Sequence, residues 1–199
     1  MKFIITFIAL SLLSCSFGED RELNNRSSLE RVSIDEADDY LEECKIPKYL
    51  PNYSKLIPLP AYFNLSEATE CAKLQNDKPI LVVFDAIGST KSKQMSNTTF
   101  SDKSILKYIS DNYILTCLYT DDKTKLEEKE YYTSNMGGSK EIITTEGRRN
   151  IELQFEKTQS GSQPYFVVLD REGNVINNAL SFTKDADFFL EWLQGNNNK

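Results

Sequence analysis

Residues 78–95 constrain the fold more than any other part of the chain, and their sequence is K-P-I-L-V-V-F-D-A-I-G-S-T-K-S-K-Q-M. Residues 80–84 form a short apolar run rich in β-branched side chains, which predicts a fully buried strand. The run breaks at 86–88. A helix is then predicted to begin at the four residues 89–92, which have Ser89 at one end and Ser92 at the other. The sequence therefore predicts a buried strand, a tight turn and a helix that begins with two serines.

The N-terminus has the pattern of a secretion signal. Lys2 precedes an apolar run over residues 3–13, which is too short to span a bilayer. The run ends in Leu-Leu-Ser-Cys, which resembles the lipobox of bacterial lipoproteins, in which Cys15 is lipidated and becomes the new N-terminus. An ordinary signal peptide with an incidental cysteine is the alternative. An aspartate after the lipidated cysteine retains such lipoproteins at the inner membrane, and here that position is Ser16. This favours a lipid-anchored protein of the outer membrane, facing the periplasm or the surface.

The composition excludes several classes of function. Removal of residues 1–14 takes away only Lys2 and leaves 22 basic against 30 acidic residues, a net charge of -8. This acidity argues against a nucleic acid partner, because no basic stripe is present to release counterions. The chain has no histidine, so catalysis by Ser-His-Asp or Cys-His groups and a histidine-ligated metal are excluded. We expect no metal and no cofactor.

The chain divides into five segments. After the signal at 1–14, residues 15–32 are polar and predict a flexible tether, and residues 195–199 predict a disordered tail. A short helix and a proline-rich extension are predicted over 33–60, and one domain over 60–194. Within the domain, helices are predicted over 65–75, 121–135, 148–157 and 185–193, and one more is predicted from a cap at Ser101 to Ile109. The last helix is expected to place Phe188, Phe189 and Trp192 in the core. Strands are predicted over 80–84, 113–119, 165–169 and 175–176.

This order of elements, together with four short motifs, resembles a known family. The motifs are Tyr62-Phe63, Lys78-Pro79, L-Y-T-D-D-K-T-K-L at 118–126 and S-Q-P-Y-F at 162–166. Residues 60–194 resemble the thioredoxin-like domain at the C-terminus of bacterial transmembrane thiol-disulfide interchange proteins and of related lipoproteins. The resemblance implies an α/β thioredoxin-like fold, in which helices flank a central mixed β-sheet.

The resemblance implies a redox site whose chemistry is missing here. In the family, a cysteine at the helix N-terminus forms a thiolate and a second cysteine three residues later resolves the mixed disulfide. Ser89 and Ser92 fall on those positions, and serine forms no disulfide. Val83 stands where the family commonly has a buried carboxylate, so the acid is also expected to be absent. We therefore expect no catalytic residue, and Ser89 to act as a helix N-cap.

The family's cis-proline segment lies beside the redox turn and pairs with an extended substrate peptide. By this resemblance, Gln163 and Pro164 would form a peptide-docking groove together with Ile87 and Ser89. The alternative is that Pro164 only shapes the core.

Three cysteines remain in the mature chain, namely Cys44, Cys71 and Cys117. In an oxidising compartment an odd number favours one disulfide and one buried thiol. Cys117 lies within a predicted strand, where cysteine behaves as a small apolar residue. We therefore expect a disulfide between Cys44 and Cys71.

Three functions are compatible with these features. The favoured one is a lipid-anchored, redox-inactive thioredoxin-like module that binds a protein or peptide in the cell envelope. The second is an envelope thiol-disulfide oxidoreductase that uses Cys44 and Cys71 as a non-standard pair. The third is a structural lipoprotein that stabilises an envelope complex.

The intact mass of the protein purified from a bacterial envelope tests the processing. We expect a chain that lacks residues 1–14 and carries a lipid on Cys15, with one disulfide, detected as a mass gain when the protein is reduced before alkylation. Cys15→Ser should abolish the lipid mass. A lipid-free chain cleaved at another position would contradict this prediction.

Overall fold

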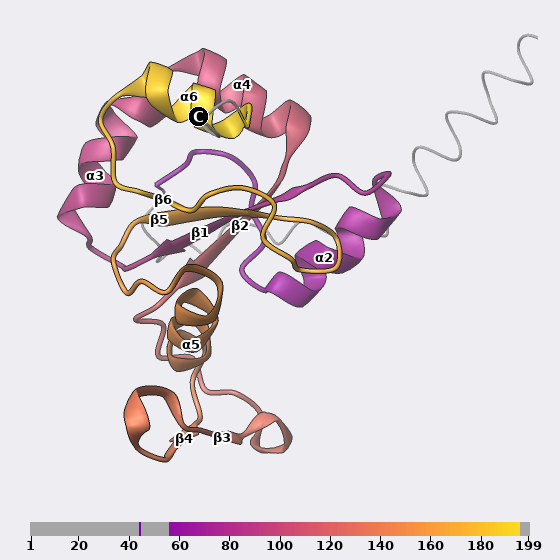
Figure 1. Ribbon diagram of the computed structural model, residues 1–199, viewed down its shortest axis with the longest axis vertical. Coiled ribbons are helices and arrows are strands. Elements are labelled where there is room, and N and C mark those ends of the chain that lie inside the picture. Colours follow the sequence, from indigo (N-terminus) through magenta and orange to yellow (C-terminus); the bar gives the residue numbers. More distant parts are fainter. Residues whose placement is uncertain (1–43, 45–55, 196–199) are drawn as a thin grey trace, which may run out of the picture. The chain divides into compact units, whose positions relative to one another are not determined.

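A four-stranded mixed sheet lies at the centre of the domain in the computed structural model, which describes Cys44 and residues 56–195 (Figure 1). The strand order is β2-β1-β5-β6. The bounds are Ile80–Asp85 for β1, Ile114–Tyr119 for β2, Tyr165–Leu169 for β5 and Leu180–Ser181 for β6. β1 is parallel to β2 and antiparallel to β5, and all of its residues are buried. The predicted central mixed sheet is confirmed.

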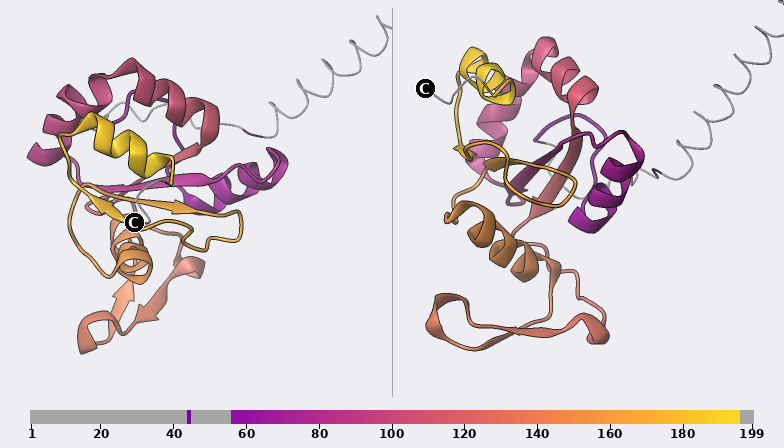
Figure 2. Two further views of the ribbon diagram at one scale, coloured as in Figure 1. Left: turned by 45° about the horizontal axis from the view of Figure 1, so that its top comes forward. Right: turned by 45° about the vertical axis from the view of Figure 1, so that its right-hand side comes forward.

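Helices cover both faces of this sheet, as the views in Figures 1 and 2 show. The helices of one face are α3 (Thr90–Asn97), α4 (Lys103–Asn112) and α6 (Ala186–Leu193). The helices of the other face are α2 (Leu65–Leu74) and α5 (Glu146–Thr158). Side chains alternate along β1, so Leu81 and Val83 join one core cluster while Val82 and Phe84 join the other. Each face of the strand is thus buried beneath its own helical layer.

Aromatic rings fill the core between the sheet and α6. The ring centroids of Phe166 and Phe189 are 5.1 Å apart, and those of Phe189 and Trp192 are 5.4 Å apart. The Trp192 Nε1 donates a hydrogen bond to the Asn178 carbonyl oxygen. Phe188 was also expected in the core, but 42% of its surface is exposed, because one helical turn presents only one side to the sheet.

A hairpin replaces the helix predicted over 121–135. The chain forms a 3-10 turn at Glu128–Glu130, strand β3 at Tyr132–Ser134, a second 3-10 turn at Met136–Gly138 and strand β4 at Glu141–Ile143. β3 and β4 pair in antiparallel register and extend away from the main sheet (Figure 1). The helix prediction is wrong because this charged segment has no apolar stripe at helical spacing, and Gly137 and Gly138 adopt positive φ values that allow the chain to reverse.

Three smaller predictions are also corrected. Asp102, not Ser101, caps α4, and its carboxylate accepts from the Ser104 N–H. The strand expected at 175–176 is a single bridge from Val175 to Leu169, and the short edge strand forms instead at β6. Helix α5 begins at Glu146 and ends at Thr158, so it is longer than the predicted 148–157, and Asn150 and Gln154 are among its buried residues.

The predictions for the N-terminal segments fall outside the described residues. These are the signal at 1–14 with the lipidation site Cys15, the tether at 15–32 and the short helix after Ser33. Among the described residues, no helix is both long and apolar enough to cross a membrane.

Substitution of Gly147 tests the contact that positions α5. Its N–H donates to the Asp122 carbonyl oxygen, and a Cβ at this position would lie 2.5 Å from that oxygen and 2.8 Å from the Thr120 carbonyl oxygen. Because both obstacles are backbone atoms, Gly147→Ala should lower the free energy of unfolding by about 1–3 kcal/mol or more. Urea denaturation measures this loss, and the exposed Gly161→Ala, which meets no atom within 4 Å, is the matched control. Equal stability of the two variants would contradict the prediction.

Candidate functional site

The turn between β1 and α3 presents the two serines. Ser89 is the N-cap of α3, and its Oγ accepts a hydrogen bond from the Ser92 N–H at 3.2 Å. Gly88 has a φ of +84°, which allows the tight turn, and the Ser89 N–H donates to the Ala86 carbonyl oxygen. Ile87 is 43% exposed, and its N–H donates to Asp121 Oδ1. The turn therefore exposes one apolar side chain on a backbone that is held by hydrogen bonds.

A buried carboxyl group lies beneath this turn. Asp85 is only 1% exposed, and its Oδ1 accepts from the Ser92 hydroxyl and from the Ala86 N–H. Its Oδ2 is buried and has no hydrogen-bond partner within the described part of the chain. The expectation that no acid remains is wrong, because Val83 is apolar but Asp85 follows it on the same face of β1. The period of two along a strand was the signal that would have found it.

Burial controls the ionisation of the groups below the turn. Burial raises the pKa of Asp85, the hydrogen bonds from Ser92 and Ala86 oppose this, and the charge of Asp121 adds to the increase. Burial, with a smaller effect of Asp85, raises the pKa of the Cys117 thiol to about 12. Cys117 is free and buried, so at neutral pH it stays a protonated thiol and not a nucleophilic thiolate.

The proline segment lies at the same end of the sheet. The Gln163–Pro164 peptide bond is cis, and the register that pairs Phe84 with Tyr165 places Pro164 beside the last residue of β1. The Gln163 Nε2 donates to the Gln154 side chain of α5. Adjacent strands therefore bring this segment to the end of the sheet that carries the serine turn.

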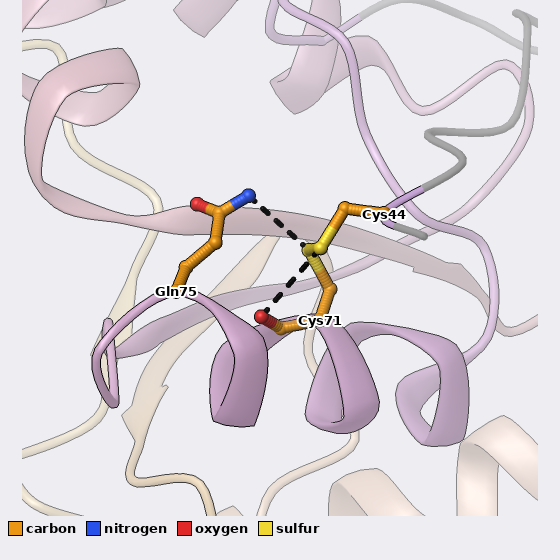
Figure 3. Close-up of a disulfide and its surroundings, with 3 residues drawn as sticks. All are labelled: Cys44, Cys71 and Gln75. Atoms are coloured by element: carbon orange, nitrogen blue, oxygen red, sulfur yellow. Dashed lines mark hydrogen bonds between the residues drawn. A yellow bond between two sulfur atoms is a disulfide. The ribbon is translucent and has the colours of Figure 1, made fainter. Parts of the chain in front are cut away.

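The disulfide lies on the other face of the sheet. It joins Cys44 to Cys71 of α2, with their Cα atoms 5.2 Å apart, and the Gln75 Nε2 donates to the Cys71 Sγ (Figure 3). Cys44 and Cys71 are 6% and 3% exposed. A cross-link over 27 residues stabilises a fold by about 3–4 kcal/mol in the chain-entropy account. Stabilisation of the fold, by joining Cys44 to α2, is therefore enough to explain why this bond is present.

No group of three or more Cys, Asp or Glu side chains in the described part of the chain is arranged to hold a metal ion.

Comparisons with known proteins bear on the fold. A family model described as a thioredoxin-like domain matches residues 65–195. Among solved structures, the chain is similar to a protein described as DsbH oxidoreductase, with a TM-score of 0.49 and 15% identity over 78% of this chain and 94% of the other. It is similar to a thioredoxin from Thermus thermophilus, with a TM-score of 0.47 and 15% identity over 67% and 84% of the two chains. The reduced C-terminal domain of DsbD from Neisseria meningitidis gives a TM-score of 0.45 and 14% identity over 67% and 96%. No curated protein matches the chain.

The pH dependence of stability tests the environment of Asp85. Because the folded state raises the pKa of Asp85, it keeps a proton that the unfolded state releases above about pH 4. The free energy of unfolding should therefore fall as the pH rises from about 4 to the raised pKa of Asp85, by up to about 1.4 kcal/mol per pH unit. Asp85→Asn cannot ionise and should remove this dependence.

Urea denaturation at a series of pH values measures the effect. Asp187→Asn, which changes an exposed aspartate on α6, is the control and should keep the wild-type slope. A slope unchanged by Asp85→Asn would show that Asp85 titrates as it does in the unfolded chain.

Proposed function

This chain belongs to the thioredoxin-like domain family, and we propose that it is a redox-inactive member, held in the bacterial cell envelope by a lipid on Cys15, that binds a protein or peptide. The outer membrane, facing the periplasm or the surface, is the proposed location, and lipid attachment is its proposed contact with the membrane. The binding surface is the end of the sheet that carries Ile87, Ser89, Gln163 and Pro164.

The redox-inactive part of the proposal depends on one observation, namely the hydrogen bonds that the two serine hydroxyls form. Ser89 Oγ caps α3, and Ser92 Oγ donates to the buried Asp85. By the family resemblance, these residues occupy the positions of the attacking and the resolving cysteine. A serine hydroxyl stays protonated at neutral pH and forms no disulfide, so the pair supports no dithiol cycle. Both side chains instead stabilise the turn.

The surface above the turn supports the binding part. Ile87 exposes an apolar side chain beside backbone that is held in place by Asp121, and rigid surfaces bind with a smaller loss of entropy. Pro164 is buried, and the register of β1 and β5 places it beside Asp85, two residues before Ile87 in the sequence. An extended peptide that contacts both segments would cover Ile87.

The disulfide supports the second candidate, an envelope thiol-disulfide oxidoreductase that uses Cys44 and Cys71. The bond is an oxidised cysteine pair, which such an enzyme requires. Two facts make it the weaker candidate: both cysteines are buried, and they belong to the core cluster on the face opposite to α3. A thiolate that attacks a disulfide must reach one of its sulfur atoms, and burial opposes this approach.

Binding to an array of extended, cysteine-free peptides tests the proposal. We expect the domain to bind a subset of the peptides, and Ile87→Asp to weaken this binding about tenfold or more, because burial of one isoleucine contributes about 1.5–3 kcal/mol. Ile176→Asp is the matched control, since Ile176 is 53% exposed and lies after β5, and it should bind as the wild type does. Equal loss in both variants, or no binding by the wild type, would overturn the binding role.

Insulin reduction by the same protein separates the two candidates. The redox-inactive module should show no turnover, and Ser89→Cys with Ser92→Cys should form a new disulfide that mass spectrometry detects. Turnover by the wild type that is lost in Cys71→Ser would establish the oxidoreductase instead. Failure of the double cysteine variant to form the bond would contradict the assignment of the turn.

A further inference from the structure

A small cavity lies beside the disulfide, between the end of α2, helix α4 and the start of β2. Cys71 and Gln75 line it from the end of α2, and Ile109 of α4 and Leu115 of β2 add apolar surface. Its volume of about 130 Å³ is close to that of an apolar cavity of roughly 150 Å³ that holds one benzene molecule. The cavity can therefore hold a small organic molecule but not a segment of a folded protein.

The disulfide meets this cavity at Cys71. The Nε2 group of Gln75, which also lines the cavity, donates a hydrogen bond to Cys71 Sγ at 3.3 Å (Figure 3). Cys71 is buried, so a thiol carried by a folded protein has no direct path to this sulfur atom. A small thiol that enters the cavity avoids this barrier, because Cys71 forms part of the cavity wall.

The cavity favours an anion, although the protein as a whole is acidic. Lys78 lines it, and no aspartate or glutamate is found among its described lining residues. The Lys78 Nζ donates to the Ser110 carbonyl oxygen, and the charge of Asp111 also acts on Lys78 from outside the lining. Burial raises the pKa of Tyr113, another lining residue, to about 12, so this phenol stays neutral. A thiolate in the cavity therefore meets an opposite charge and no like charge among these lining residues.

We propose that this cavity admits a low-molecular-weight thiol, which reduces the disulfide between Cys44 and Cys71. The thiolate attacks Cys71 Sγ, the bond between the two cysteines breaks, and Cys44 leaves as a thiolate that takes a proton from water. A second thiolate then attacks the sulfur of the small molecule in the mixed disulfide and releases Cys71. Two electrons thus pass from two small thiols to the protein, and the products are two cysteine thiols and the oxidised small disulfide.

Gln75 assists the second step. The leaving group of this step is the Cys71 thiolate, and a thiolate that is stabilised leaves faster. The Gln75 Nε2 already donates to Cys71 Sγ in the oxidised protein, so the donor is in place when negative charge develops on that sulfur atom. The same hydrogen bond therefore favours release of the cysteine from the mixed disulfide.

Reduction separates Cys44 from α2, so the cross-link responds to the small thiols that surround the protein. This reaction differs from the second candidate function, in which Cys44 and Cys71 exchange with the disulfide of another protein. It also does not depend on peptide binding at Ile87, which is not a lining residue of the cavity. The proposal is therefore a chemical modification site additional to the binding surface.

Reduction by two thiols of different size tests the proposal. The protein is incubated with 2-mercaptoethanol or with the tripeptide glutathione at equal thiolate concentration, free thiols are alkylated at intervals, and the mass of the chain reports the reduced fraction. The ratio of the two rates is divided by the ratio measured for the protein unfolded in urea, which corrects for intrinsic reactivity. We expect the folded protein to favour 2-mercaptoethanol about tenfold or more, because only the smaller thiol fits the cavity.

Two variants test the groups in the cavity wall. Gln75→Met removes the donor to Cys71 Sγ, and Lys78→Gln removes the cation. Each should slow reduction by 2-mercaptoethanol about threefold or more, because each removes one favourable interaction with a thiolate. Gln94→Met on α3 and Lys103→Gln on α4 change exposed residues outside the cavity and should react as the wild type does.

Several results would overturn the proposal. The first is an equal corrected rate for the two thiols. The second is a rate that rises with low urea in proportion to unfolding, which would show that the bond reacts only in unfolded molecules. The third is an unchanged rate in both Gln75→Met and Lys78→Gln. Faster reduction by a protein thiol than by 2-mercaptoethanol would also overturn it and would favour the second candidate function instead.

Discussion

Complete burial of β1 is the constraint on which the rest of the domain depends. A strand without an exposed residue needs a partner strand on each side and a layer of side chains on each face, because buried backbone groups and apolar surface must both be satisfied. β2 and β5 supply the partners, and two sets of helices supply the layers. The strand ends at Asp85, whose backbone carbonyl oxygen accepts from the N–H and the hydroxyl of Thr120. The position of the serine turn follows from where this strand ends.

The serine turn, which we propose to be a redox-inactive form of the family's site, has its polar groups in structural roles. Ser92 and Asp85 form a hydrogen bond in a place where water does not reach, and the Cys117 thiol lies below with a raised pKa. Each group has a structural use or is too buried to react. The apolar side chain of this region that faces solvent is Ile87, which belongs to the surface that we propose for binding.

The position of helix α5 has a different physical cause. Helix α5 is anchored by polar contacts: Asn150 donates to Tyr119, Gln154 donates to Ser162, and Gly147 donates to Asp122. These bonds hold α5 close to the end of β2, and the chain between β2 and α5 forms the projecting hairpin (Figure 2). These hydrogen bonds, together with the packing of Leu153 against the core, therefore position α5.

The sequence by itself determined the elements that are encoded by neighbouring residues. The apolar run of β1 and the Ser89 cap of α3 are readable locally, because burial pattern and capping depend on residues a few positions apart. Only the tertiary structure decided the features that join distant segments. Asp85 became a buried acid because α3 folds over it, the charged residues 121–145 became a hairpin because they pair with each other, and the polar side of α5 became its buried side because its partners are carbonyl groups from other elements.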